Sequence, residues 1–197
     1  MKTAYYGLDF GTSNCVISVN INGSVKTLPI NFSNDKTDIL ESAIYFSKTN
    51  NISYGSEAIK KYLDELEMSN MAKTETVVGK NIVKILQGSE FIKIKESIET
   101  TNFNSGRIIR SFKSGLSSSG VYKTNINGKL YDLEDIVTLF LSEIKRRADK
   151  ILGLNIETVV IGRPYKFVGD NSNATVPLKR LESIAKRSGF KDIFFEY

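Results

Sequence analysis

The sequence contains no histidine and a single cysteine, Cys15. Histidine is the commonest general base and the commonest zinc ligand, so its absence excludes Ser–His–Asp, Cys–His and histidine–metal mechanisms within this chain. One cysteine excludes an internal disulfide framework. Any chemistry must therefore come from carboxylates, hydroxyls, lysines, backbone amides and an ion such as magnesium. That restriction favours phosphoryl transfer, in which positioning and charge neutralisation dominate.

Long apolar runs are also missing. No run approaches the roughly 18 residues of a membrane helix, and residues 1–6 contain neither an apolar signal region nor a cleavage site. We therefore expect a cytoplasmic protein without a membrane partner. A hydrophobic fraction of 41% in 197 residues is enough for the packed core of one domain or slightly more.

The positive charge of the chain is not concentrated. The net charge is +5, but the lysines are scattered rather than arranged in a stripe, and we therefore expect no nucleic-acid partner. The densest basic run is Lys145–Arg147. Because it falls on the outer part of a predicted amphipathic helix, we interpret it as a solvated helix face.

What the sequence does contain, close to its start, is the stretch Gly7-Leu-Asp-Phe-Gly-Thr-Ser-Asn14. It predicts a strand ending in an acid, a glycine turn with two hydroxyls, and a second strand. Gly11 lets the backbone approach an oxyanion, and Thr12 and Ser13 offer amide and hydroxyl donors. Asp9 offers a carboxylate to a hydrated divalent metal. A plain hairpin with a Gly-Thr-Ser turn fits the same residues, so the motif alone leaves both readings open.

Hydrophobic periodicity and turn signals outline the rest of the chain. The helix that follows Asp132 has a capping residue at its start and Gly153 as its stop. Residues 67–130 show a weaker pattern, apart from a hairpin over residues 123–131 on an Asn-Gly turn. The predicted strands are residues 4–10, 14–21, 24–30, 42–47, 157–161 and 193–197, and the predicted helices are residues 55–66, 132–152 and 176–188.

These elements predict an α/β fold with a mixed sheet. A three-strand antiparallel meander comes first, an inserted subdomain follows, and an α-β-α-β unit with parallel strands ends the chain. This is the layout of half of an actin-like ATPase, the ribonuclease-H-type lobe. We expect residues 1–35 and 105–197 to form its core and residues 36–104, approximately, to form the inserted subdomain.

Three segments resemble the DnaK-type 70-kDa heat-shock chaperone family, which belongs to the actin-like ATPases. Residues 7–14 resemble its first phosphate loop, and Thr158–Phe167 resembles the strand that ends in a proline–aromatic loop. The Gly-Arg-Pro version of this loop is typical of a divergent bacterial branch. The third segment, Leu181–Tyr197, is similar to the helix–Gly–strand unit of the family. The resemblance covers residues 4–30 and 105–197, whereas residues 31–104 match only in position.

The resemblance implies ATP or ADP with Mg²⁺ as cofactors. Asp9 would help to hold the water shell of the magnesium ion. Lys113 lies where the family has a lysine that reaches the γ-phosphate, and it is the candidate catalytic residue. The residues implied to bind the nucleotide phosphates are Gly11, Thr12, Ser13 and Asn14.

Three further residues have lesser roles in this reading. Arg163 and Pro164 are expected to shape the loop beside the site, although a plain strand-ending turn fits them equally well. Cys15 faces either the core or the nucleotide, and we expect a small buried side chain without a redox role.

The resemblance also implies what would follow Tyr197: a glutamate, a second phosphate loop and the adenosine pocket. We therefore expect an N-terminal lobe with one wall of the cleft, which binds nucleotide weakly or not at all and uncovers apolar surface suited to self-association. Unfolded peptide and co-chaperones would bind through regions outside these residues. An actin-like filament or segregation protein, a small-molecule kinase and a non-catalytic binding module remain alternatives.

Overall fold

The computed structural model describes most of the chain. The described residues are 4–33, 37–68, 75–76, 79–87, 90–98, 101–102, 106–117, 122–162 and 175–196.

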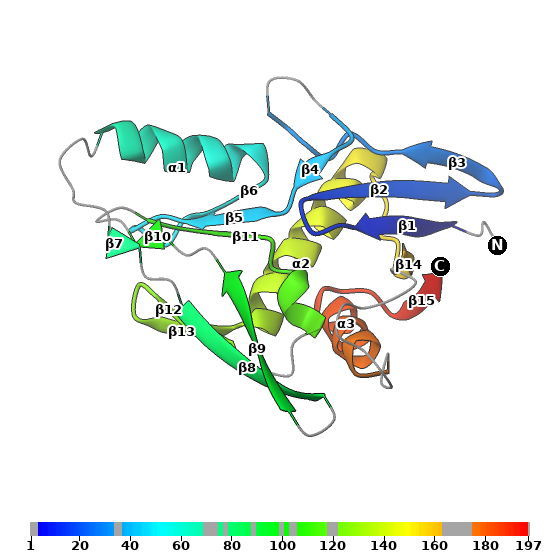
Figure 1. The fold of residues 1–197 in the computed structure, drawn as a ribbon. Helices are drawn as coiled ribbons and strands as arrows, with labels where there is room; N and C mark the ends of the chain where they lie inside the picture. Colours follow the sequence, from blue (N-terminus) through cyan, green and yellow to red (C-terminus); the bar gives the residue numbers. More distant parts are fainter. Residues whose placement is uncertain are drawn as a thin grey trace.

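The main sheet has six strands, and five of them lie in the order β15-β14-β1-β2-β3, with β4 pairing on β2 (Figure 1). β1, β2 and β3 pair antiparallel in chain order, whereas β14 and β15 run parallel to β1. The carboxyl ends of β1, β14 and β15 therefore meet at one edge of the sheet. The strands are β1 (Ala4–Phe10), β2 (Asn14–Ile21), β3 (Ser24–Thr27), β4 (Leu40–Glu41), β14 (Thr158–Gly162) and β15 (Asp192–Glu196).

The third strand is shorter than the predicted range of 24–30. The Leu28 amide still donates to the carbonyl of Ile17 at 2.9 Å. Pro29 has no N–H to donate, so the ladder stops there and β3 ends at Thr27.

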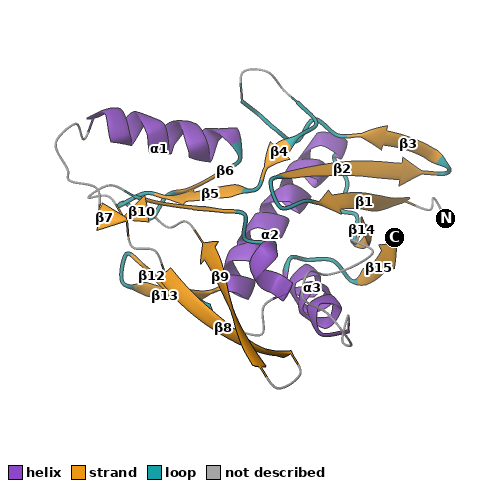
Figure 2. Ribbon diagram, viewed as in Figure 1, coloured by secondary structure: helices purple, strands orange, loops and turns teal. Residues whose placement is uncertain are grey.

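Both helices of the second half, α2 (Leu133–Leu152) and α3 (Thr175–Arg187), pack on the same face of this sheet (Figure 2). Side chains of successive strand residues alternate between the two faces. Tyr6, Leu8 and Phe10 are therefore buried against the helices, whereas Asp9 is exposed on the opposite face. The apolar stripe of α2 completes the core, with Ile136, Val137, Phe140, Leu141, Ile144 and Ala148 all buried.

The helix ends follow the predicted signals. Asp132 caps α2 by accepting the amide of Asp135 at 2.7 Å, and the Asp135 carboxylate accepts the Asp132 amide in return. Gly153 ends α2 in the left-handed region with φ +65°, as predicted. Past the end of α3, Gly189 is also left-handed, with φ +98°.

A second sheet, in the order β11-β5-β6, carries α1 on one side (Figure 1). Tyr45 and Ala43 of β5 pack against Ala58 of α1, whereas Ile44 and Phe46 join the main core. The hairpin predicted over residues 123–131 is confirmed, and Asn127 and Gly128 form its turn with positive φ. The remaining elements are β5 (Ala43–Phe46), β6 (Ile52–Tyr54), α1 (Ser56–Met68), β7 (Glu75–Thr76), β8 (Gly79–Gln87), β9 (Glu90–Ile98), β10 (Thr101–Asn102), β11 (Arg107–Arg110), η1 (Ser114–Ser117), β12 (Lys123–Ile126) and β13 (Lys129–Asp132).

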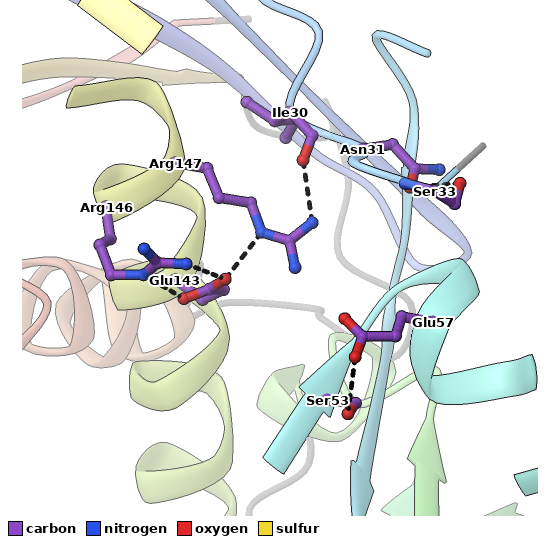
Figure 3. A network of polar contacts seen from close by, with 8 residues as sticks. All are labelled: Ile30, Asn31, Ser33, Ser53, Glu57, Glu143, Arg146 and Arg147. Carbon is purple, nitrogen blue, oxygen red and sulfur yellow. Dashed lines mark hydrogen bonds and ion pairs between the residues drawn. The ribbon is translucent and has the colours of Figure 1, made fainter. Parts of the chain in front are cut away.

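The interpretation of Lys145–Arg147 as a solvated face is wrong for two of its three residues. Only the Arg146 side chain is exposed, at 59%; those of Lys145 and Arg147 are 8% and 6% exposed. Arg147 donates to Glu143 at 2.7 Å and to the carbonyl of Ile30 at 2.9 Å (Figure 3).

The physical reason for this burial lies in the helix period and in the length of the side chains. Arg147 is three residues after Ile144 and seven after Phe140, so it projects from the same side of α2 as the apolar stripe. Its aliphatic stem is buried along that stripe while the guanidinium reaches polar partners. The buried ammonium of Lys145 also has polar partners, because it donates to Asp149 and Asn155, each at 2.6 Å.

Among the helices of the described residues, none is long and apolar enough to span a membrane.

Candidate functional site

The turn between β1 and β2 projects exposed polar groups at one end of the main sheet. The Gly11 amide donates to the carbonyl of Asn14 at 3.0 Å, which closes the turn around Thr12 and Ser13. A Cβ atom at position 11 would lie 2.2 Å from that carbonyl oxygen, so a residue with a side chain cannot replace Gly11 without opening the turn. The side chains of Thr12, Ser13 and Asn14 are exposed. The turn therefore presents two hydroxyls and an amide side chain to solvent.

Ser42 supports the turn through hydrogen bonds to its backbone. Its amide donates to the carbonyl of Ser13 at 2.8 Å, and its hydroxyl donates to the carbonyl of Gly11 at 3.0 Å. Its own carbonyl accepts the amide of Ser111 at 3.3 Å. Ser42 is 3% exposed, so these bonds are shielded from water. It thus joins the turn to the segment that leads into Lys113.

The sequence offered no signal for this role of Ser42. It was predicted only as the first residue of a short strand, and its contacts depend on how two distant segments meet. The hydroxyl lies 31 residues from Gly11 along the chain.

Lys113 lies against the turn. Its ammonium donates to the carbonyl of Phe10 and is 5.4 Å from the centroid of the Phe10 ring. Phe112 holds this segment in the core, because its ring stacks on Phe10 with centroids 6.3 Å apart and meets Phe140 edge-on at 5.0 Å. The structure therefore brings together two segments that the sequence separates by 103 residues.

Two features of the surroundings of Lys113 shift its pKa in opposite directions. Burial lowers the pKa of the half-buried Lys113, while the negative charge of Asp9 opposes that shift. Asp9 is thus close enough to favour the charged ammonium. The site therefore combines the Lys113 ammonium, the Asp9 carboxylate and the hydroxyl-bearing turn at the carboxyl end of β1.

Asp9 stands at the carboxyl end of β1. In the sheet its parallel neighbour is Gly162 of β14, whose own neighbour is Glu196 of β15. Gly162 has no side chain that could cover Asp9, and Asp9, Gly162 and Glu196 are all exposed. An exposed carboxylate beside a glycine is suited to a hydrated ion. In the described part of the chain, no group of three or more Cys, Asp or Glu residues could hold a metal ion.

Cys15 lies beneath the turn and is fully buried. Its sulfur is 3.4 Å from the Ser42 hydroxyl and 3.9 Å from the Gly11 carbonyl. Burial raises the pKa of the thiol to about 11, against the smaller opposing effect of these hydrogen bonds. The expected small, buried side chain is confirmed, and it faces the core.

A comparison with models of protein families identifies the family to which this protein belongs. The family model described as Hsp70 protein matches residues 5–178, a range that includes Asp9, the turn and Lys113. The protein belongs to the Hsp70 family. The resemblance to this family noted in the sequence is thereby confirmed over residues 5–178. Hsp70 proteins bind ATP or ADP, usually with Mg²⁺.

Membership of the Hsp70 family supports a chaperone-like, ATP-binding ATPase lobe. A mixed α/β structure with several sheets and three helices is compatible with the actin-like ATPase fold. As chaperones, Hsp70 proteins bind peptide substrates and co-chaperones, and they are generally cytoplasmic.

The expectations for Arg163 and Pro164, and for the polar loop predicted after them, lie outside the described residues.

Proposed function

We propose that this Hsp70-family protein binds MgATP with its phosphates at the Gly11–Asn14 turn, and that Lys113 contacts the γ-phosphate. One observation carries the proposal. The Lys113 ammonium donates to the carbonyl of Phe10, the residue directly before the turn. A cation held there by tertiary packing is placed where the charge of a triphosphate would be neutralised.

The donor set fits this ligand. The amides and hydroxyls of Thr12 and Ser13 are donors on an exposed turn, and successive backbone amides of a turn can bind an anion such as phosphate. The Lys113 ammonium carries three protons, so it can bond the Phe10 carbonyl and still donate to phosphate oxygens. Asp9, being exposed and anionic, is suited to the water shell of a magnesium ion.

Each residue then has a defined task in hydrolysis. The turn orients the phosphates, and Lys113 stabilises the negative charge that develops on the transferring phosphoryl group. A bound magnesium ion would neutralise further charge between the phosphates. Ser42 keeps the turn and the Lys113 segment in register through its bonds to both. We place this hydrolysis in the conformational cycle of a chaperone.

The assigned residues contact only the phosphates and the metal. Affinity for the nucleotide as a whole therefore depends on contacts with the adenosine that other residues make. We accordingly propose that the turn, Lys113 and Asp9 by themselves give only weak affinity for the nucleotide and are not sufficient for its hydrolysis.

Isothermal titration of the full-length protein with MgATP and MgADP tests the proposal. We expect Lys113→Met to weaken MgATP binding about tenfold or more, the cost of losing hydrogen bonds to a charged group, and to change MgADP binding much less. Lys123→Met is the matched control, because it removes the same charge from an exposed position on β12. No heat at millimolar nucleotide, or an equal loss in both variants, would refute the proposal.

A further inference from the structure

The position of Lys113 depends on the short helical turn η1, which begins at the next residue. The Leu116 amide donates to the carbonyl of Lys113 at 3.0 Å, and the Ser114 amide donates to the carbonyl of Ser111 at 3.3 Å. Ser111 has φ +53°, in the left-handed region that residues other than glycine seldom adopt. The backbone on both sides of Lys113 is therefore held by η1, and whatever holds η1 also holds the lysine.

Two helices hold η1. On the side of α2, Gly115 packs so closely that a Cβ atom there would lie 2.9 Å from Cδ2 of Leu133. On the side of α3, the Arg180 guanidinium donates to the carbonyl of Leu116 at 3.0 Å. Arg180 thus bonds directly to the backbone of η1.

Arg180 is itself anchored to α2. Its Nε donates to Glu134 at 2.7 Å, and its second terminal nitrogen is also 2.7 Å from that carboxylate. The Arg180 side chain is only 21% exposed. A planar guanidinium with several donors in fixed directions can join three segments in this way, whereas a lysine ammonium cannot reproduce the fork.

The same pair of helices has a second ion pair that does not involve η1. Arg187 of α3 pairs with Asp135 of α2. Both carboxylates belong to the first turn of α2, and both arginines belong to α3. Among the contacts between described residues, the bond to η1 distinguishes Arg180 from Arg187.

We propose that Arg180 is a positioning residue for nucleotide binding: it fixes η1 to α2 and α3 and thereby keeps the Lys113 ammonium beside the Gly11–Asn14 turn. The proposal rests on the proposed function of Lys113. It also connects α3 to the site, because a shift of α3 would move Arg180 and, through η1, Lys113.

The experiment compares MgATP and MgADP affinities of the full-length protein in four forms: wild type, Arg180→Ala, Arg187→Ala and Lys113→Met. Because Lys113 is assigned to the γ-phosphate, loss of its position should lower the preference for ATP over ADP. We expect Arg180→Ala to lower that preference roughly threefold to tenfold, as for residues coupled through contact. Arg187→Ala removes an equal charge and a similar ion pair, so we expect it to leave the preference unchanged.

A double variant shows whether Arg180 acts through the lysine. In the Lys113→Met background, Arg180→Ala should change the preference no further. If Arg180→Ala does not fold, Glu134→Gln and Arg180→Lys replace it, because each weakens the same bonds between Arg180 and its partners. Both variants should lower the preference for ATP over ADP, but less than Arg180→Ala.

The outcomes separate the two proposals. If wild type binds MgATP and Lys113→Met loses the preference for ATP while Arg180→Ala keeps it, the role of Arg180 is refuted and the proposed function stands. The role is also refuted if Arg187→Ala has the same effect or if the effects of Arg180→Ala and Lys113→Met add in full. If Lys113→Met itself keeps the preference for ATP, the proposed function of Lys113 is refuted, and the role of Arg180 that rests on it is refuted as well.

Discussion

Neighbouring arginines on α2 offer a test of how burial sets the strength of an ion pair. Arg146 and Arg147 both bond to Glu143, at 2.7–2.8 Å and 2.7 Å respectively. Their side chains are 59% and 6% exposed. Arg147→Ala and Arg146→Ala therefore remove the same kind of group from the same carboxylate, in different surroundings (Figure 3).

Arg147→Ala should be strongly destabilising. It removes the bond to Glu143, the bond to the buried carbonyl of Ile30 and the contact of the guanidinium with the Phe32 ring at 5.1 Å. Loss of one partner of a buried pair costs about 3–5 kcal/mol. Because Arg146 still neutralises Glu143, we expect the lower end, about 3 kcal/mol, which lowers Tm by roughly 6–12 °C in a domain of this size. Arg146→Ala should cost at most about 1 kcal/mol, since exposed pairs contribute little.

The dependence on pH provides a second readout. Burial alone would raise the pKa of Glu143, but the hydrogen bonds and charges of Arg146 and Arg147 outweigh it and hold the pKa below its ordinary value of 4.5. A carboxylate whose pKa is lowered by folding stabilises the protein above its unfolded-state pKa, and this stabilisation is lost as the pH falls through the folded-state value. The difference in Tm between wild type and Arg147→Ala should therefore be largest near neutral pH and shrink below pH 4.5.

Thermal unfolding followed by circular dichroism measures both effects. Equal losses of Tm in the two variants, or a loss of less than about 1 kcal/mol in Arg147→Ala, would show that burial does not govern this pair. A difference that persists unchanged at low pH would show that the charge of Glu143 is not involved.

Further predictions concern the turn and its surroundings. Gly11→Ala should weaken MgATP binding measured by calorimetry, because the added methyl would meet the Asn14 carbonyl at 2.2 Å; unchanged affinity would mean that the turn does not contact the phosphates. Ser42→Ala should lower Tm by about 2–4 °C, the effect of losing one net hydrogen bond of about 1 kcal/mol, and a melting curve like that of wild type would contradict the support assigned to its hydroxyl. Cys15, with its pKa raised to about 11 by burial, should react with a thiol reagent at pH 8 only after unfolding; rapid labelling of the native protein would show that the core opens there.

Much of the fold could be predicted from the sequence because its signals are local. The helix α2 is defined by an apolar stripe, the cap Asp132 and the stop Gly153. The turn between β12 and β13 is defined by Asn127 and Gly128, which adopt the positive φ that such a turn requires. These signals act over one or two turns of chain, so each can be recognised without knowing what the element packs against.

The turn Gly11–Asn14 was recognisable as a candidate phosphate site for the same reason. Gly11, Thr12 and Ser13 are contiguous, and their chemistry is visible in the sequence. Lys113 was found through resemblance to a family and not through its surroundings, which contain no local mark of function.

Only the tertiary structure decided which distant groups meet, at this turn and elsewhere in the core. Ser42 supports Gly11 across 31 residues, the Lys113 ammonium reaches Phe10 across 103, and Arg147 donates to Ile30 across 117. Such contacts depend on how the sheet, α2 and η1 pack together, and no periodicity or cap within one element encodes them. For this reason the sequence alone determined the turn as a phosphate-binding candidate, whereas the packing decided which residues support it and buried two of the three basic residues predicted to face solvent.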